Sequence, residues 1–195
     1  SQDAAHADLI GSAITAGHIV ECASACSGGM SSCFAEMPQM GMVGFPIVEF
    51  SRDGTFVVTK PEDTGGKVNG FTVKEHLVYE IADPANYIMP DGIADFTTLT
   101  LEDLGNDRVR ISGVRGKGVP EQLKLVIGYQ DGWIGEGMVM FPWPRAYERA
   151  VKARQTLTER FERLGLQADD ILFNFVGLDT LHGPATQDTD IPDLN

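Results

Sequence analysis

The stretch that decides the fold class is Phe45-Pro46-Ile47-Val48-Glu49-Phe50-Ser51-Arg52-Asp53-Gly54-Thr55-Phe56-Val57-Val58-Thr59-Lys60. Two β-rich runs, residues 45–50 and 55–60, flank a turn in which Asp-Gly supplies the positive backbone dihedrals of a tight hairpin. Helical periodicity lies on both sides of this hairpin. We therefore expect an α+β (mixed α/β) fold, with β-hairpins and a mixed sheet packed with about three helices.

Three helices are expected outside the hairpin. The first covers residues 4–25, with Leu9, Ala13, Ala16 and Val20 at helical spacing. The second starts at Thr72, where Glu75 three residues later predicts a capping box, and stops at Asp83-Pro84. The third covers residues 144–164 and ends at Gly165. Further strands are expected at residues 93–101, 108–113, 123–129, 133–141 and 171–176.

Charge and composition exclude several classes of protein. With 15 Lys and Arg against 28 Asp and Glu, the net charge is -13. Nucleic acids and anionic membrane surfaces are therefore unsuitable partners, because both are bound through Lys and Arg. Hydrophobic residues make up 43% of the chain, which is enough for a packed core. No apolar run approaches the roughly 20 residues of a membrane-spanning helix.

The domain organisation is expected to be simple. Residues 1–185 form a single α+β domain, and residues 186–195 form an acidic, mobile tail. The chain begins with Ser1, so we expect a fragment or a processed part of a longer protein. Its three cysteines, Cys22, Cys26 and Cys33, are too few and too clustered for a disulfide framework, and the given sequence shows no signal-peptide pattern. These features favour the reducing cytoplasm.

A first candidate site lies near the end of the first helix. His18, Cys22 and Cys26 follow one another at i,i+4 steps and would share one face if the helix continued, as ligands of a soft metal could. The alternative is structural: buried thiols and a histidine bonded to a backbone carbonyl. The Cys spacing matches no familiar zinc pattern, so no cofactor is expected. Glu21, beside a glycine-rich turn, is a candidate general base.

Two further candidates lie late in the chain. Glu136 stands between Gly135 and Gly137, after Asp131-Gly132, where bare backbone allows a ligand to approach closely. A simple glycine-rich hairpin explains this segment equally well. Asp179 and His182 follow a hydrophobic run, and an Asp-His pair could set the imidazole tautomer. An ordinary polar loop is the alternative.

Two other segments carry weaker signals. Residues 113–118, which contain Arg115, combine glycines with basic side chains and could cradle a phosphate or carboxylate, although a surface turn is the simpler explanation. The Met-rich loop at residues 27–44 could form a flap over a site or contact another subunit. A poorly ordered loop is the alternative. Walker, G-x-S-x-G and H-E-x-x-H motifs are missing from the sequence.

Several blocks, taken together and in order, resemble the acyclic terpene utilisation (AtuA-like) family. They are Gly17-His18-Ile19-Val20-Glu21-Cys22 with Gly28-Gly29, Gly44-Phe45-Pro46-Ile47, Thr64-Gly65-Gly66, Glu75-His76-Leu77-Val78-Tyr79-Glu80-Ile81 with Asp83-Pro84 and Tyr87, Asp107-Arg108-Val109-Arg110 with Gly113 and Arg115-Gly116, Tyr129-Gln130-Asp131-Gly132-Trp133-Ile134-Gly135-Glu136-Gly137, and Asp179-Thr180-Leu181-His182-Gly183. Where family members usually carry Gly-Ala-Gln-x-Thr after Glu-Cys, this chain has Ala23-Ser24-Ala25-Cys26-Ser27. The chain resembles a central to C-terminal portion of these longer proteins.

The resemblance implies a protein of branched or isoprenoid acid catabolism, often accompanied by a small partner protein or fused domain. We expect an enzyme, most plausibly a lyase or hydratase, that acts on a small-molecule acid or acyl-thioester. Its catalytic residues would be Glu21, Glu136, Asp179 and His182. The residues expected to bind substrate are Gly28, Gly29, Thr64, Gly65, Gly66, Arg115, Asp131, Gly135 and Gly137.

The rival hypothesis is a non-catalytic subunit that completes a site together with a partner polypeptide. Either a homo-oligomer or a hetero-oligomer with a companion chain is expected.

Overall fold

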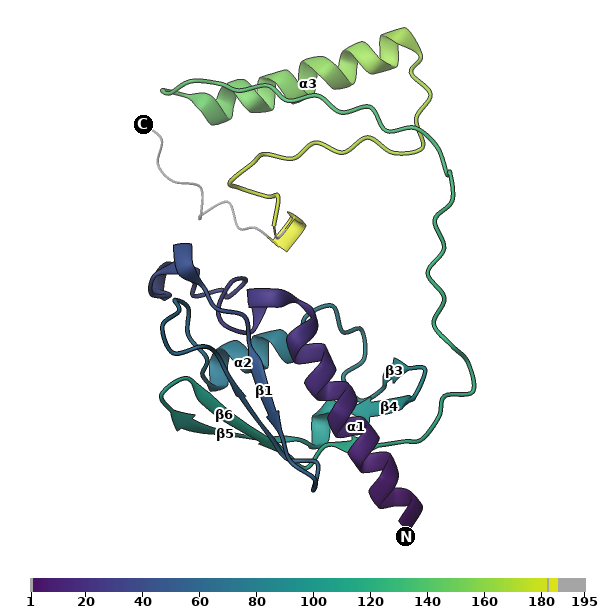
Figure 1. Ribbon diagram of the computed structural model, residues 1–195. Helices are drawn as coiled ribbons and strands as arrows, with labels where there is room; N and C mark the ends of the chain where they lie inside the picture. The colour runs from purple at the N-terminus through teal and green to yellow at the C-terminus, as the bar shows by residue number, and fades with distance from the viewer. Residues whose placement is uncertain (1, 182, 186–195) are drawn as a thin grey trace. The chain divides into compact units, whose positions relative to one another are not determined.

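The computed structural model of the protein describes residues 2–181 and 183–185 and divides into two compact units, Ser1–Gly128 and Tyr129–Asn195 (Figure 1). The first unit contains α1 (Gln2–Glu21), α2 (Gly70–Leu77), β1 (Ile47–Phe50), β2 (Phe56–Thr59), β3 (Tyr87–Met89), β4 (Gly92–Asp95), β5 (Thr100–Gly105), β6 (Arg108–Ser112) and β7 (Arg115–Gly116). The second contains α3 (Ala146–Leu164). Short 3-10 turns occur at Ala23–Ala25, Phe34–Glu36, Met40–Met42, Phe96–Thr98 and Gly183–Ala185. The α+β class is confirmed.

The predicted hairpin is present as β1 and β2. The two strands are antiparallel, with Ile47 opposite Thr59 and Phe50 opposite Phe56. In the turn, Gly54 has a φ of +85°, and the Asp53 carboxylate accepts hydrogen bonds from the Thr55 amide and hydroxyl. The turn therefore lies where the sequence predicts it, but only Gly54 has the expected positive φ, and Asp53 contributes through its carboxylate.

Two antiparallel sheets are built around this hairpin, with strand orders β1-β2-β6-β5 and β3-β4-β7. On β6, Val109 and Ile111 are fully buried, whereas Arg110 between them is exposed and pairs with Glu102 on β5. This alternation means that one face of the four-stranded sheet carries the core and the other faces water.

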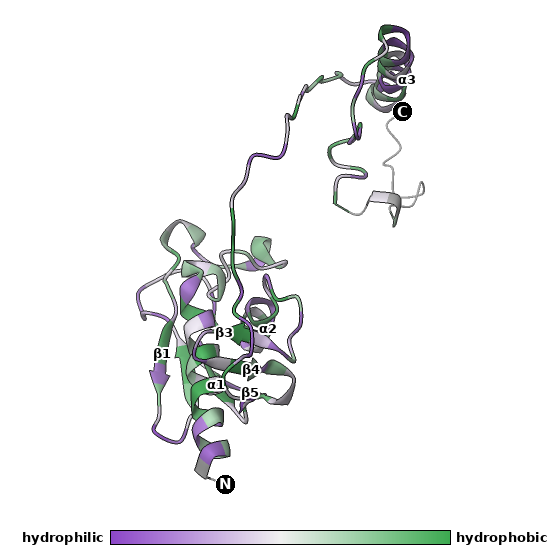
Figure 2. Cartoon of the chain, turned by 90° about the vertical axis from the view of Figure 1, so that its right-hand side faces the viewer, coloured by the Kyte–Doolittle hydropathy of each residue, from purple (hydrophilic) through white to green (hydrophobic). Residues whose placement is uncertain are grey.

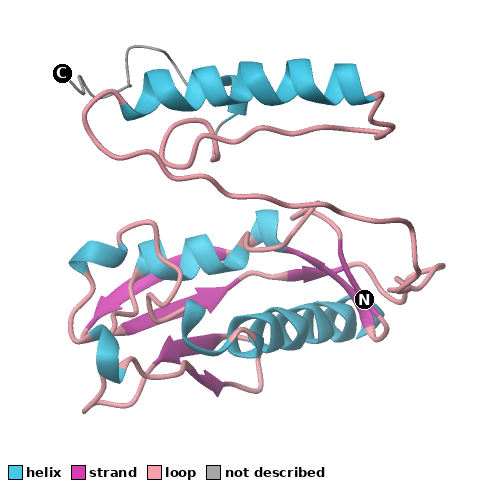
Figure 3. Ribbon diagram, turned by 90° about the horizontal axis from the view of Figure 1, so that it is seen from above, coloured by secondary structure: helices cyan, strands magenta, loops and turns pink. Residues whose placement is uncertain are grey.

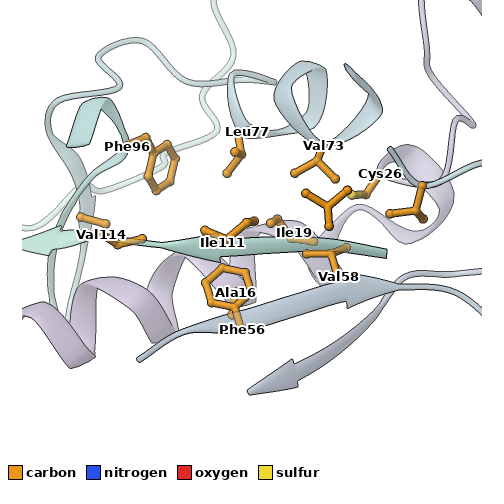
Figure 4. Close-up of a cluster of buried hydrophobic side chains, with 13 residues drawn as sticks. Ala16, Ile19, Cys26, Phe56, Val58, Val73, Leu77, Phe96, Ile111 and Val114 are labelled. Atoms are coloured by element: carbon orange, nitrogen blue, oxygen red, sulfur yellow. The ribbon is translucent and has the colours of Figure 1, made fainter. Parts of the chain in front are cut away.

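The core of the first unit lies between that face and the helices (Figure 4). Its members are apolar side chains from α1, α2, both sheets and the connecting loops: Ala16, Ile19, Cys26, Phe56, Val58, Val68, Val73, Leu77, Ala94, Phe96, Val109, Ile111 and Val114. Removal of this apolar surface from water is the main stabilising force. The core also fixes where α1 and α2 end relative to each other.

Helix α1 ends four residues earlier than expected. It stops at Glu21, and Ala23 has a φ of +50°, so the i,i+4 face does not continue from Cys22 to Cys26. Near its start, α1 contacts β7 closely: the Asp8 carboxylate accepts a hydrogen bond from the Gly116 amide at 3.0 Å. The position of the helix is therefore set by contacts at both ends.

The predicted start of α2 is corrected by the structure. The N-cap is Asn69, whose side chain accepts hydrogen bonds from the amides of Phe71 and Thr72 at 2.9 Å. Thr72 is the third residue of the helix. Its hydroxyl oxygen accepts a hydrogen bond from the Asn69 amide, which completes the capping box. The helix ends at Leu77, before the predicted Asp83-Pro84 stop. Glu75 instead binds the loop that follows α1.

Several predicted strands are also corrected (Figure 3). The run 93–101 is divided into β4, a 3-10 turn and β5, because the Asp95 carboxylate accepts a hydrogen bond from the Thr97 amide and starts the turn. The runs 123–129, 133–141 and 171–176 have strand-like sequences but form no strand. A strand exists only when a neighbouring strand accepts its backbone hydrogen bonds, and these runs have none in the described residues.

The second unit is organised around α3. The predicted helix is confirmed with a slightly later start, and Gly165 has a φ of +64° in the expected cap. Phe175 packs edge-on against Tyr147, and the Arg154 guanidinium lies 5.1 Å from the Phe175 ring centre. Figure 2 shows apolar and polar residues interspersed along the extended segment before α3. In the described part of the chain, no helix is both long and apolar enough to cross a membrane.

Candidate functional site

Acid and base side chains gather where α1 and α2 end. Glu21 is the last residue of α1, and Cys22 follows it. Tyr79 and Glu80 lie just beyond the end of α2, and Tyr87 begins β3. We call these five residues the helix-end cluster. The segments that carry them are about 60 residues apart in the sequence and meet where His18, near the end of α1, contacts His76, near the end of α2, and Tyr87.

Burial and the two carboxylates raise the pKa values of the thiol and phenol groups in the cluster. Burial, followed by the charges of Glu21 and Glu80, raises the pKa of the Cys22 thiol. A hydrogen bond to Glu80, together with its charge, raises the pKa of Tyr79. Burial, then Glu21, raises the pKa of Tyr87. The cluster therefore combines two carboxylates with neutral hydroxyl and thiol groups.

The carboxylates of the cluster are not neutralised by basic residues. Among the described residues, neither Glu21 nor Glu80 forms an ion pair with Lys or Arg. Both are exposed, and Glu80 has a left-handed backbone with a φ of +58°. Both therefore retain free oxygen atoms that could accept a proton from a ligand.

Two buried histidines lie beneath the helix-end cluster. The ring centres of His18 and His76 are 5.0 Å apart, and the His18 ring also lies 5.2 Å from that of Tyr87. His18 is thus a packed histidine bonded to a backbone carbonyl, as the structural alternative from the sequence requires.

The hypothesis of a His18, Cys22 and Cys26 metal site receives no support. Cys26 is fully buried in the core, where burial raises the pKa of its thiol to about 12. Within residues 2–181 and 183–185, no group of three or more His, Cys, Asp or Glu side chains could hold a metal ion. The early end of α1 explains this result, because it separates Cys26 from the other two residues.

The predicted glycine-rich binding segments come together, but they pack against protein. Atoms of the chain lie under 3.0 Å from where a Cβ would be at Gly28, Gly29, Gly65 and Gly66. At Gly65 the nearest atom is the Gln39 carbonyl oxygen, at 2.0 Å. The Gly66 amide donates to the Pro38 carbonyl at 2.7 Å, and the Thr64 hydroxyl donates to the Pro61 carbonyl at 2.7 Å. These contacts give the glycines a packing role, and substrate binding by this group stays a prediction.

The Met-rich loop at residues 27–44 is held to the rest of the unit by hydrogen bonds. The Ser31 hydroxyl donates to Glu75 at 2.7 Å, and the Ser32 amide donates to the same carboxylate at 3.0 Å. These two bonds hold the loop to α2. The interpretation of this segment as a poorly ordered loop is therefore not supported.

Arg115 has a structural partner. Its guanidinium lies 2.6 Å from the Asp8 carboxylate on α1, and its side chain is otherwise largely exposed. The adjacent Gly116 amide bonds the same carboxylate. Arg115 therefore joins α1 to β7, and its predicted contact with a ligand stays a prediction.

The remaining predicted residues belong to the second unit. The exposed segment before α3 contains Asp131, Gly135, Glu136 and Gly137. No atom lies within 4 Å of where a Cβ would be at Gly132, Gly135 or Gly137. The Asp179 carboxylate accepts a hydrogen bond from the Phe175 amide at 2.7 Å. His182 lies outside the described residues. Each unit is described by itself, so convergence of these residues with Glu21 stays a prediction.

Sequence reasoning identified Glu21 and missed its neighbours in space. Tyr79, Glu80 and Tyr87 stood in the family blocks, but nothing in their spacing linked them to Glu21. A usable signal was the placement of a Tyr-Glu pair immediately after a short helix. His18 lies three residues before the end of α1, and His76 lies one residue before the end of α2. A histidine in the last turn of each helix was a second signal.

Comparison with known proteins adds a family assignment. No curated protein and no solved structure matches the chain. The sequence model of the acyclic terpene utilisation family protein AtuA matches residues 3–193, nearly all of the given chain. The resemblance seen in the sequence blocks is thereby confirmed, and the chain belongs to the AtuA family of acyclic terpene utilisation proteins.

Proposed function

We propose that the protein is a cytoplasmic catabolic enzyme that moves a proton next to the carbonyl of a branched or isoprenoid acid or acyl-thioester, as a lyase or hydratase does. The observation that carries this proposal is the helix-end cluster, in which two carboxylates without a Lys or Arg partner among the described residues stand beside two tyrosines. The cytoplasmic location is supported by three cysteines that all remain free.

In the proposed reaction, Glu21 removes a proton from the carbon beside the carbonyl. The resulting enolate carries its charge on oxygen, which requires a hydrogen-bond donor. Tyr87 can supply such a donor, because its phenol is neutral and burial raises its pKa further. Tyr79 can supply a second donor when its hydroxyl turns from Glu80 to the enolate. Glu80 accepts the hydrogen bond of the Tyr79 hydroxyl and orients that phenol. Glu21, which carries the proton after the first step, returns it to the carbon.

The proposal is tested by proton exchange. A saturated, β-methyl-branched acyl-thioester is incubated with the protein in D2O, and deuterium at the α-carbon is measured by NMR. This readout reports proton removal whatever later step follows. Glu21→Gln removes the base with little change in size and should lower the exchange rate by about 10²- to 10⁴-fold.

The control is Glu62→Gln, which changes another exposed glutamate outside the helix-end cluster and should leave the rate unchanged. Tyr79→Phe tests the donor and should also lower the rate. The sequence-based prediction that Glu136 and His182 act as acid or base is tested by Glu136→Gln and His182→Gln in the same assay. A loss below tenfold for Glu21→Gln contradicts the proposed base.

A second candidate function is that of a subunit that completes a site together with a partner polypeptide. It is favoured by the apolar side chains exposed on the segment before α3, where Val126, Trp133 and Ile134 are 85%, 94% and 96% exposed. Large apolar side chains that face water are typical of surfaces that another protein covers.

Native mass spectrometry separates the two functions. A single species with the mass of one chain that catalyses α-deuteration alone supports the enzyme and contradicts the subunit. A chain that is inactive alone and gains activity in a complex with a second polypeptide supports the subunit.

A further inference from the structure

The buried histidines His18 and His76 form a reciprocal pair. The Nε2 atom of His18 lies 3.0 Å from the backbone oxygen of His76, and the Nε2 atom of His76 lies 2.9 Å from the backbone oxygen of His18. Both side chains are more than nine-tenths buried. Each ring thus bonds the main chain of the other residue.

These contacts fix which nitrogen of each ring carries a proton. A carbonyl oxygen can only accept a hydrogen bond, so each Nε2 atom must carry the proton. In a neutral imidazole the Nδ1 atom is then an unprotonated acceptor. Both Nδ1 atoms are buried and have no hydrogen-bond partner among the described residues. The pair therefore fits the neutral form of both histidines.

The two helices meet at their C-terminal ends, which explains the pairing. The last carbonyls of a helix have no partner within that helix. The His76 carbonyl lies in the last turn of α2 and the His18 carbonyl in the last turn of α1, and each is bonded by the imidazole of the opposite helix. The Tyr79 amide also donates to the His76 carbonyl, at 3.0 Å. The pair thus joins the backbone segments that carry the helix-end cluster.

A proton added to Nδ1 has no acceptor at this position. The groups around His18 are His76 from α2, Glu80 after α2, Glu21 on its own helix, and the rings of Tyr87 and Phe96. Burial and the charge of the neighbouring His76 lower the pKa of His18. They outweigh the hydrogen bond to the His76 backbone and the charges of Glu21 and Glu80, which raise it. The neutral ring is therefore the form that the folded unit favours.

We propose that His18 and His76 are a positioning pair that holds the ends of α1 and α2 together, and that mild acid releases the helix-end cluster by protonating His18. Release of the helix ends follows from the pair alone. Its consequence for turnover rests on the proposed function.

The sign of the pH dependence follows from the two states. When the helix ends separate, His18 returns toward its ordinary pKa of 6.5 and binds a proton that the joined state excludes. Joining is therefore fully favoured above pH 6.5 and weakens as the pH falls below it. Uptake of one proton on opening changes the equilibrium constant for separation of the helix ends by at most about tenfold per pH unit.

The first experiment measures amide hydrogen exchange of Tyr79 and Ile81 between pH 7.5 and pH 5, corrected for the intrinsic exchange rate. Both amides donate within the turn that follows α2. We expect their protection to fall by at least fivefold across this range, while the C2 proton of His18 titrates below pH 6.5 in NMR spectra. Constant protection while His18 titrates, or titration at or above pH 6.5, overturns the proposal.

Glutamine variants separate titration from packing. The amide of glutamine can donate to the same carbonyl and does not titrate, so the double variant His18→Gln and His76→Gln should keep the protection at pH 7.5 and lose its pH dependence. His6→Gln is the matched control, because His6 is exposed on the same helix. A double variant that keeps the wild-type pH dependence contradicts the proposal. If the double variant does not fold, the wild-type measurement decides.

A last measurement separates this proposal from the proposed function. The acid side of the pH profile of α-deuteration should move to lower pH in the glutamine double variant. If no α-deuteration is detectable while the protection of Tyr79 still falls in acid, the proposed function fails and the positioning pair stands. If deuteration is normal and protection is independent of pH, the pair fails and the function stands.

Discussion

Gly116 on β7 shows how a missing side chain fixes the position of a helix. A Cβ atom at this residue would lie 1.8 Å from the Ala7 carbonyl oxygen on α1. We expect Gly116→Ala to lower the free energy of unfolding of the first unit by roughly 3 kcal/mol, because backbone must move to accept the methyl group. Urea denaturation monitored by circular dichroism measures the change.

The matched control for that substitution is Gly17→Ala. Gly17 lies inside α1 with no atom within 4 Å of an added Cβ. Alanine there should stabilise the helix by about 0.5 to 1 kcal/mol. Equal effects of the two substitutions would contradict the close contact assigned between Gly116 and Ala7.

At the scale of one element, the stability of α2 depends on the hydrogen bonds made by its N-cap residue, Asn69. The Asn69 side chain accepts hydrogen bonds from two backbone amides at the start of this eight-residue helix. Without the cap, these amides would have no partner within the helix. We expect Asn69→Ala to lower the free energy of unfolding by about 1 kcal/mol, whereas Asn69→Asp keeps the cap and changes it by a few tenths. Denaturant unfolding of both variants tests this, and an aspartate variant as unstable as the alanine variant would contradict the assigned cap.

At the scale of the whole molecule, the exposed connecting segment should be the site of fastest proteolysis. Lys124 is exposed, and its neighbours form no helix or strand. The Lys117 amide, by contrast, donates a hydrogen bond to the Ile93 carbonyl on β4, and the Lys117 ammonium lies 3.2 Å from the Asp95 carboxylate. We expect trypsin to cut after Lys124 at least tenfold faster than after Lys117, because cleavage requires local opening of the backbone.

Mass spectrometry of timed digests identifies the first fragments. Faster cleavage after Lys117 would contradict this ranking. Protection of Lys124 in a complex with another polypeptide would give independent support to the subunit function.

Local sequence signals predicted the elements whose stability is local. The Asp53-Gly54 turn defined the hairpin, and Gly165 defined the end of α3, because turn and cap conformations depend on neighbouring residues only. The capping of α2 was misjudged by three residues. Thr72 and Asn69 are both good cap residues, and Asp103 on β5, whose carboxylate accepts from the Gly70 amide, is a contact that no local pattern reveals.

Strand prediction failed where a strand needs a partner far away in the chain. The runs 123–129 and 171–176 have suitable side chains, yet backbone hydrogen bonding depends on a second strand. The candidate site was predicted in part for the same reason. Glu21 was recognised from its local setting, whereas Tyr79, Glu80 and Tyr87 became neighbours only when α1 and α2 packed on the shared core.

The sequence by itself determined the acidic character, the α+β class, the family and the hairpin with its turn, because each depends on composition or on residues close together in the chain. Only the tertiary structure decided that α1 stops at Glu21, that the glycines of residues 65 and 66 serve packing, and that His18 and His76 bond each other's backbone. These features arise from contacts between segments distant in the sequence, and such contacts form only when the chain buries its apolar side chains in one core.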